Sequence, residues 1–201
     1  MGRKNILLYS FIFLLPFFGC DKESTRTDDF LVEFAIVKKV GDDVTFRLDN
    51  GTILTPEGTT NLEIEDGNRV ILNYTPLEKG VIKVNSVRRI FMGSIKKEGY
   101  PNDVKTDPVR IISVWVSGIF LNISFEVDYH SKSHRAGLYR DMSADEQTLY
   151  FSYSREDDPL GAPTLSYMSF NLESLQKKNF TVFINTYEGQ RKFEFEKEGE
   201  R

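Results

Sequence analysis

The sequence predicts an all-β protein in which a small barrel precedes a seven-stranded sandwich. Apolar and polar side chains alternate without interruption through residues 121–129, the pattern of a strand with one buried face. Glycine, asparagine and aspartate separate further runs of this kind at short intervals. Only residues 144–147, behind a capping box of Ser143 and Glu146, and residues 172–177 favour helix, each for about one turn.

The first twenty residues predict a lipoprotein signal peptide. Arg3 and Lys4 precede a mostly apolar run over residues 6–18, which is too short to span a bilayer, and Gly19-Cys20 follows. We expect cleavage after residue 19 and lipidation of Cys20, which is the only cysteine. The alternative is an ordinary signal peptide that ends beside an unpaired thiol.

Residues 20–29 are expected to form a flexible tether, because the segment after Cys20 has no apolar side chain to bury. Removal of residues 1–19 leaves 24 basic and 30 acidic residues, a net charge of −6. Nucleic acid and anionic lipid head groups are therefore poor partners for the mature chain. A single cysteine excludes an intramolecular disulfide.

Residues 30–95 are expected to form the barrel. The alternating run at residues 44–48 is followed by Asn50-Gly51, a two-residue hairpin signal that predicts a partner strand directly after it. Further strands are expected at residues 30–40, 69–76 and 81–91, the last two joined by a turn at residues 78–80. Five short strands in about 65 residues favour a small closed sheet.

Residues 96–107 are expected to be a linker, because charge, glycine and proline interrupt the strand pattern there. The sandwich is then expected to occupy residues 108–199. Its predicted strands are residues 109–116, 120–129, 134–141, 148–154, 165–171, 180–187 and 190–197.

The two histidines, His130 and His134, flank a predicted three-residue loop and share this hairpin with Asp128. A His-His-Asp metal site is geometrically allowed, but residues beside a turn are usually exposed and polar. We therefore predict no metal site and no cofactor, and expect both histidines to be dispensable.

No catalytic residues are predicted. Serines are plentiful but lie in no nucleophile motif, and Cys20 is committed to lipid. The acidic run from Glu156 to Asp158, followed by Pro159, favours a solvated turn rather than a glycosidase pair, and it lacks the spacing of a calcium loop.

Exposed side chains for partners are harder to choose. The basic pairs Arg88-Arg89 and Lys96-Lys97 favour a charged strand edge rather than a nucleic-acid surface. Four tyrosines are candidates for contact with a protein or glycan, although a core or rim position is the better explanation for each: Tyr139, Tyr150, Tyr153 and Tyr167.

Four segments in this order resemble the NigD-like lipoproteins of Bacteroidota: NRVILNYTPLEKGVIKVNSVRRI, DPVRIISVWVSGIFLNISFEV, SREDDP and SFNLESL. The resemblance implies an OB-like barrel, an immunoglobulin-like sandwich and a place in the outer membrane or at the cell surface. It supplies no active-site residues.

Two functions remain open, a non-enzymatic binding or immunity module and an accessory subunit of an envelope complex. The first would present loops to an envelope protein, peptide or glycan. A metal protein or hydrolase centred on His130 and His134 is the least favoured alternative.

Overall fold

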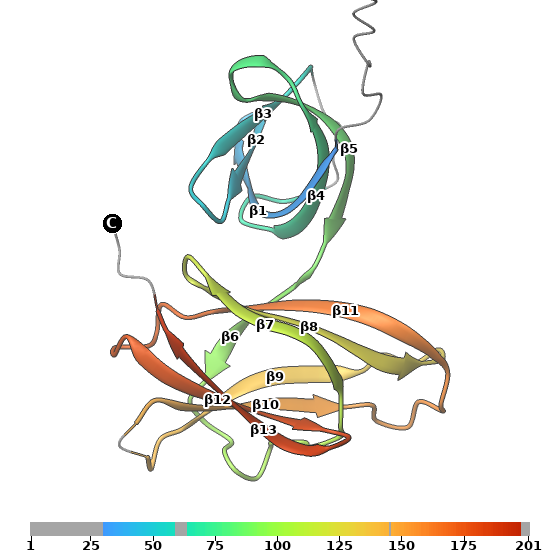
Figure 1. Ribbon diagram of the computed structural model, residues 1–201, viewed down its shortest axis with the longest axis vertical. Coiled ribbons are helices and arrows are strands. Elements are labelled where there is room, and N and C mark those ends of the chain that lie inside the picture. Colours follow the sequence, from blue (N-terminus) through green and yellow to red (C-terminus); the bar gives the residue numbers. More distant parts are fainter. Residues whose placement is uncertain (1–29, 59–63, 145, 198–201) are drawn as a thin grey trace, which may run out of the picture.

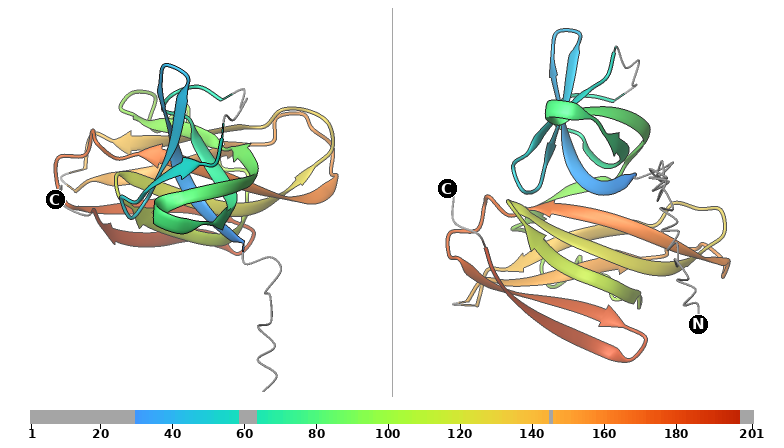
Figure 2. Two further views of the ribbon diagram at one scale, coloured as in Figure 1. Left: turned by 90° about the horizontal axis from the view of Figure 1, so that it is seen from above. Right: turned by 45° about the horizontal axis from the view of Figure 1, so that its top comes forward.

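The computed structural model describes residues 30–58, 64–144 and 146–197. The predicted signal peptide, Cys20 and tether lie outside these residues. No helix in the described part is long and apolar enough to cross a membrane. Two β domains are present, with the barrel standing on one layer of the sandwich (Figures 1 and 2).

The barrel closes in the strand order β1-β2-β3-β5-β4. Its strands are β1 (Leu31–Val40), β2 (Asp43–Leu48), β3 (Ile53–Pro56), β4 (Arg69–Pro76) and β5 (Val81–Arg89). Alternate inward side chains fill it, among them Phe46, Val70 and Leu72, none of which is exposed. A small all-β domain with five strands is confirmed.

The turns of the barrel differ from the prediction in one detail. The β2–β3 loop has three residues, Asp49 to Gly51, because the amide of Leu48 donates to the carbonyl of Thr52 and the amide of Gly51 donates to the carbonyl of Leu48. Gly51 has φ +87°, a conformation that glycine adopts without steric cost. The predicted β4–β5 turn is present as a single 3-10 turn, Glu78–Gly80.

Strand β6 (Phe91–Lys96) corrects the predicted domain boundary. It pairs in parallel with β11 through residues 91–94 and with β9 through Ile95 and Lys96, and so joins the two layers of the sandwich. Gly93 allows this close packing, since an added Cβ would lie 2.9 Å from the Phe170 ring. The barrel therefore ends at β5, and the sandwich begins at Phe91.

The other strands of the sandwich are β7 (Arg110–Ser117), β8 (Phe120–Tyr129), β9 (Arg135–Asp141), β10 (Thr148–Ser154), β11 (Ala162–Asn171), β12 (Asn179–Thr186) and β13 (Gly189–Glu196). Their order is β13-β12-β10-β9-β6-β11-β8-β7. All seven predicted strands are present, and β6 is an eighth. The layers enclose one apolar core that includes Phe125, Phe151 and Phe170.

Residues 172–177, for which the sequence favoured a helical turn, form no helix. They begin with a turn in which the Leu175 amide donates to the Leu172 carbonyl.

The segment predicted as a linker is packed against the sandwich. Tyr100 stacks on Tyr150 with ring centroids 4.6 Å apart, and Tyr150 stacks on Phe183 at 5.2 Å. The Lys105 amide donates to Ser152 Oγ at 2.8 Å, and the Tyr153 amide donates to the Lys105 carbonyl. Because the Tyr100 ring stacks on β10 and the Lys105 backbone forms hydrogen bonds with β10, this segment is part of the sandwich domain.

The contact between the domains, here called the junction, is built around Arg69 of β4. This side chain is fully buried and forms a bidentate ion pair with Asp49. It also donates to Asn122 Oδ1 at 3.1 Å and to Ser169 Oγ at 3.3 Å, both on the sandwich, and lies over the ring of Phe120 at 4.3 Å.

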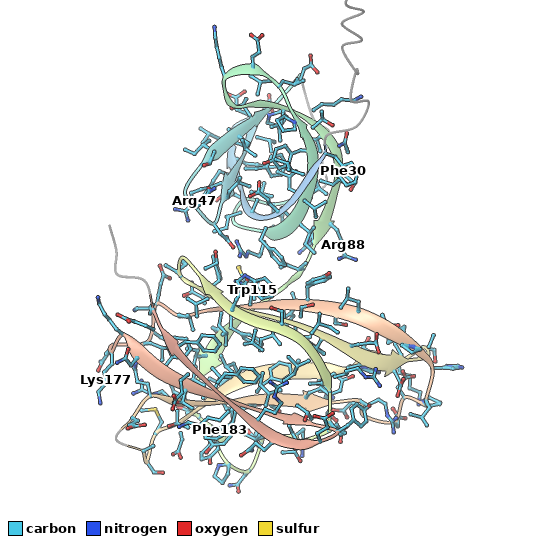
Figure 3. The ribbon with its side chains drawn as sticks, in the orientation of Figure 1. Phe30, Arg47, Arg88, Trp115, Lys177 and Phe183 are labelled. Carbon is cyan, nitrogen blue, oxygen red and sulfur yellow. The ribbon has the colours of Figure 1, made fainter. Side chains whose placement is uncertain are left out.

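Aromatic rings surround this polar centre of the junction. Trp115, which lies on the face of the sandwich toward the barrel, meets Phe34 edge-on at 5.3 Å (Figure 3). Tyr167 also packs against Phe34. The guanidinium of Arg88 lies over the Tyr167 ring, 5.2 Å from its centroid. Tyr167 and Arg88 therefore belong to the junction rather than to a free surface.

Candidate functional site

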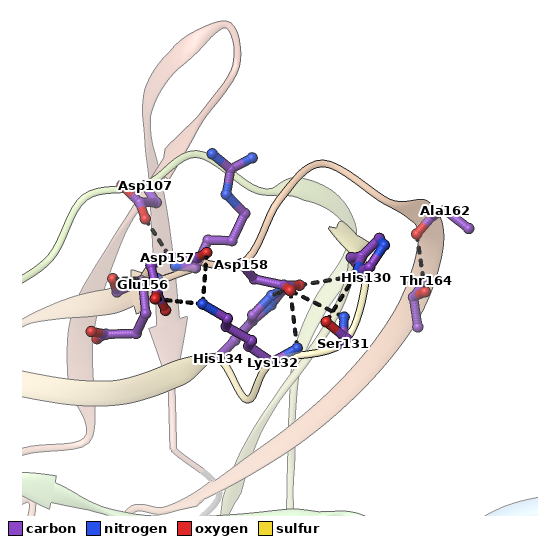
Figure 4. Close-up of polar contacts among 12 residues, drawn as sticks. Asp107, His130, Ser131, Lys132, His134, Glu156, Asp157, Asp158, Ala162 and Thr164 are labelled. Carbon is purple, nitrogen blue, oxygen red and sulfur yellow. Dashed lines mark hydrogen bonds and ion pairs between the residues drawn. The ribbon is translucent and has the colours of Figure 1, made fainter.

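The candidate site is the loop end of the sandwich, defined here as residues 128–134, 155–161 and 186–189 with Asp107 and Pro108. Asp158 organises it. Its carboxylate accepts hydrogen bonds from the backbone amides of His130, Ser131 and Lys132 at 2.9–3.0 Å and contacts His134 Nε2 at 3.0 Å (Figure 4). One buried side chain thereby holds the whole β8–β9 loop from the facing β10–β11 loop.

The charge of Asp158 is set by two opposing effects. Burial raises the pKa of this carboxyl, while the three backbone amides and the His134 ring favour its ionised form. The hydrogen bonds prevail and hold the pKa of Asp158 well below its usual range. The loop is therefore tied by an anion at every pH near neutrality.

His134 connects Asp158 to Tyr153. The tyrosine hydroxyl lies 2.5 Å from Nδ1 of the imidazole, and the ring of Tyr129 packs edge-on against the same imidazole. Burial is the main cause that raises the pKa of Tyr153, and the charges of Tyr187 and Asp107 add to it. The protonated hydroxyl thus donates to Nδ1, and Nε2 carries the hydrogen that is donated to Asp158.

These contacts correct the sequence interpretation of the histidine hairpin. His134 is not an exposed turn residue, since its side chain is only 9% exposed, and Asp158 is not a solvated acid, since it is 2% exposed. The exposed His130 contacts Ser131 Oγ instead. The carboxylate that meets this hairpin comes from Asp158 on another loop, and in the described structure Asp128 forms no hydrogen bond or ion pair with either imidazole.

The chemistry available to this cluster is limited. Both nitrogens of the buried His134 ring are engaged by Asp158 and Tyr153, so neither is open to a substrate. Among the described residues no group of three or more His, Cys, Asp or Glu side chains is placed to hold a metal ion. Asp157 is exposed and pairs with Lys132. The arrangement fixes loop geometry more readily than it supports proton transfer.

A groove of about 260 Å³ opens beside this cluster. Tyr153 forms one wall, while the side chains of Leu160 and Tyr187 are 71% and 58% exposed. The complete lining is Asp107, Pro108, Val127, Asp128, Tyr153, Arg155, Leu160 and Tyr187. An apolar floor with charges of both signs at its rim has the composition of a small binding site. Of these residues, the sequence singled out Tyr153 as a possible contact residue and Asp128 as a possible metal ligand.

The acid stability of the protein tests the role of Asp158. A carboxyl whose pKa is lower in the folded state than its ordinary value of 3.8 stabilises the fold above about pH 4, and this contribution is lost as the pH falls. We expect Asp158→Asn to lower the melting temperature at pH 7, and the difference from the parent protein to shrink toward pH 2. Thermal unfolding across this range measures both.

The matched control for this experiment is Asp157→Asn. The Asp157 side chain is 80% exposed, and its ion pair with Lys132 contributes little in water. A difference between the Asp158 variant and the parent that stays constant from pH 7 to pH 2 would show that the charge of Asp158 is not what ties the loop.

The barrel and the sandwich define a class of two-domain, all-β proteins, and comparison with known proteins places the chain within it. Residues 34–90 match the NigD-like N-terminal OB domain, and residues 93–196 match the NigD-like C-terminal beta sandwich domain. The chain belongs to the NigD-like family. A search of the curated proteins found no match.

Solved structures agree with this assignment. A "putative toxin related protein" from Parabacteroides distasonis is 30% identical, with a TM-score of 0.74 over 83% of this chain and 92% of its own. A NigD-like immunity protein from Bacteroides caccae is 20% identical, with a TM-score of 0.66 over 85% and 99%. A "putative lipoprotein" from Bacteroides fragilis is 15% identical, with a TM-score of 0.69 over 87% and 100%. The last two similarities show the fold alone.

Proposed function

We propose that this protein is a lipid-anchored, non-enzymatic binding module of the bacterial envelope, attached through Cys20 in the outer membrane. The observation that carries the binding role is the groove at the loop end, where Leu160 and Tyr187 are exposed beside a loop tied down by Asp158. A preorganised site loses little freedom on binding, which favours affinity.

The partner that suits this groove best is a protein or peptide. Tyrosine and leucine offer apolar contact area, and Asp128 and Arg155 supply both signs of charge at the rim. The names of the solved relatives, an immunity protein and a "putative toxin related protein", point in the same direction. An immunity role, in which the loop end captures a toxic polypeptide, is the form of this proposal that those names favour.

The anchor follows from the sequence and from one relative. Gly19-Cys20 after a short apolar run is a lipidation signal, and the Bacteroides fragilis relative is a "putative lipoprotein". Attachment to a membrane would keep the module where exported polypeptides pass.

Site-specific crosslinking in intact cells of the source organism tests the binding role. A photoreactive amino acid at Tyr187 is expected to give a discrete protein adduct, identified by mass spectrometry, which disappears when Leu160→Asp is added. The matched control is Ile53, an apolar residue of the barrel that is 61% exposed. Equal adducts from both positions, or none from Tyr187, would contradict a partner at the loop end.

A further inference from the structure

A second pocket lies away from the groove, on the outer face of the sandwich. It encloses about 300 Å³ over β9 and β10, and the segment after β6 forms one rim. Its lining is Lys96, Asp103, Lys105, Arg135, Ala136, Gly137, Tyr139, Ser152, Ser154 and Glu156. We call it the cationic pocket. It shares no lining residue with the groove.

The floor of the cationic pocket is open because residue 137 is glycine. A Cβ at this position would lie 3.2 Å from the Tyr139 ring and 3.5 Å from Lys96 Nζ. Any other side chain would therefore project into the space between the lysine and the tyrosine. The backbone of Gly137 belongs to strand β9 and pairs with Ser152 of β10, so glycine is not needed there for a turn.

Two buried hydroxyl groups face this space, and each has a hydrogen that it could donate to a ligand. Tyr139 and Ser152 are 7% and 5% exposed. Tyr139 accepts a hydrogen bond from Lys96 Nζ at 3.1 Å, and Ser152 accepts one from the Lys105 amide at 2.8 Å. Both oxygens thus act as acceptors, and neither hydroxyl hydrogen has an acceptor among the described residues. Buried polar hydrogens without an acceptor are costly, and a ligand oxygen would satisfy them.

The charges at the rim favour an anion. Lys96, Lys105 and Arg135 face two carboxylates, Asp103 and Glu156. Arg135 pairs with Glu156 at 3.4 Å, whereas no described carboxylate lies within 4 Å of either lysine ammonium. Lys96 is held instead over the ring of Tyr139, 4.7 Å from its centroid. This local excess of positive charge stands out in a chain whose net charge is −4.

We propose that the cationic pocket binds the oxyanion group of a small ligand, a carboxylate, sulfate or phosphate carried on a sugar-sized molecule. The oxyanion sits between Lys96, Tyr139 and Ser152, and Lys105 and Arg135 close over it. Ammonium groups and hydroxyl donors are the partners that such oxygens prefer. The volume is at the lower end of the range of small-molecule sites, which matches a single charged sugar. This site is independent of the partner proposed for the loop end.

Calorimetric titration of the mature protein with four sugars tests the proposal. Glucuronate, galactose 6-sulfate and galactose 6-phosphate present the three oxyanions, and galactose lacks one. We expect at least one of the charged sugars to bind about tenfold or more tightly than galactose, since a charge-assisted hydrogen bond is worth about that factor. The charged sugar that binds most tightly identifies which oxyanion, carboxylate, sulfate or phosphate, the pocket prefers.

Two variants locate the binding. Lys96→Met removes the ammonium at nearly constant length, and Gly137→Val fills the floor. Each is expected to weaken binding of the charged sugar about tenfold. The control is Lys83→Met, an exposed lysine of the barrel strand β5. Circular dichroism shows whether each variant is folded. Absence of binding to all three charged sugars, equal binding of galactose, or undiminished binding by both folded pocket variants would overturn the proposal.

Discussion

Arg69→Ala is expected to lower the free energy of unfolding by about 3 kcal/mol, because it leaves the Asp49 carboxylate without its partner inside the junction. The same change removes the donors to Asn122 and Ser169, which are the polar contacts between barrel and sandwich. The two domains are then expected to unfold in separate transitions instead of one. No other described side chain contacts both domains in this way through hydrogen bonds.

Urea titration with two probes measures this effect. Trp115 is the only tryptophan and packs at the junction, so its fluorescence reports local separation. Far-ultraviolet circular dichroism reports the strands of both domains. In the parent protein the two curves are expected to coincide, and in Arg69→Ala the fluorescence change is expected to come first.

The control for the junction is Lys38→Ala, an exposed lysine of the barrel strand β1, for which we expect a change of about 0.5 kcal/mol or less. Arg69→Lys retains the charge but not the bidentate geometry, so intermediate stability is expected. Coincident curves and unchanged stability in Arg69→Ala would mean that ring packing alone holds the domains together.

Cys20→Ser is expected to abolish membrane attachment, the largest effect on location that a single substitution can have here. A lipidated N-terminal cysteine carries more than one acyl chain, and two chains suffice for stable anchoring, whereas one does not. Without the thiol there is no acceptor for lipid. The variant protein should therefore appear in the soluble fraction or remain as an uncleaved precursor. Fractionation of cells followed by detection of the C-terminal domain measures this.

Ser24→Ala, in the same predicted tether, is the control and should stay wholly in the membrane fraction. A Cys20→Ser protein that is cleaved at the same bond and still partitions with membranes would contradict the proposed anchor. Metabolic labelling with a fatty-acid analogue adds a direct readout, since label should enter the parent protein and the control but not Cys20→Ser.

The strands could be predicted because their pattern is local. Alternation through residues 121–129 identifies strand β8 and its apolar face, since successive side chains of any strand point to opposite sides. The expectation of a single buried face was wrong: Asn122 and Ser124 on the opposite face are buried as well, and Arg69 of the barrel contacts Asn122 there. Gly41 and Gly51 mark turns for an equally local reason, because both have positive φ. The division into barrel and sandwich followed from strand spacing and from four matching segments.

The candidate site could not be predicted because its contacts are not local. Asp158 stands in an acidic, proline-ended run that has the composition of an exposed turn. Its burial depends on three backbone amides more than twenty residues earlier, which are aligned only when β8 and β10 face each other across the sandwich. The buried position of His134 likewise depends on distant residues, Asp158 and Tyr153, which contact its two ring nitrogens.

The sequence by itself determined the fold class and most of the strands, since hydrophobic periodicity along the chain encodes these, and the resemblance of four segments indicated the family. Only the tertiary structure decided which strand β6 joins, that residues 97–107 are packed, and that Lys96, Lys105 and Arg135 surround one pocket. The physical reason is that a strand pattern specifies a side-chain direction but not the partner of the backbone hydrogen bonds. Those partners come from distant segments whose positions exist only once the layers have packed.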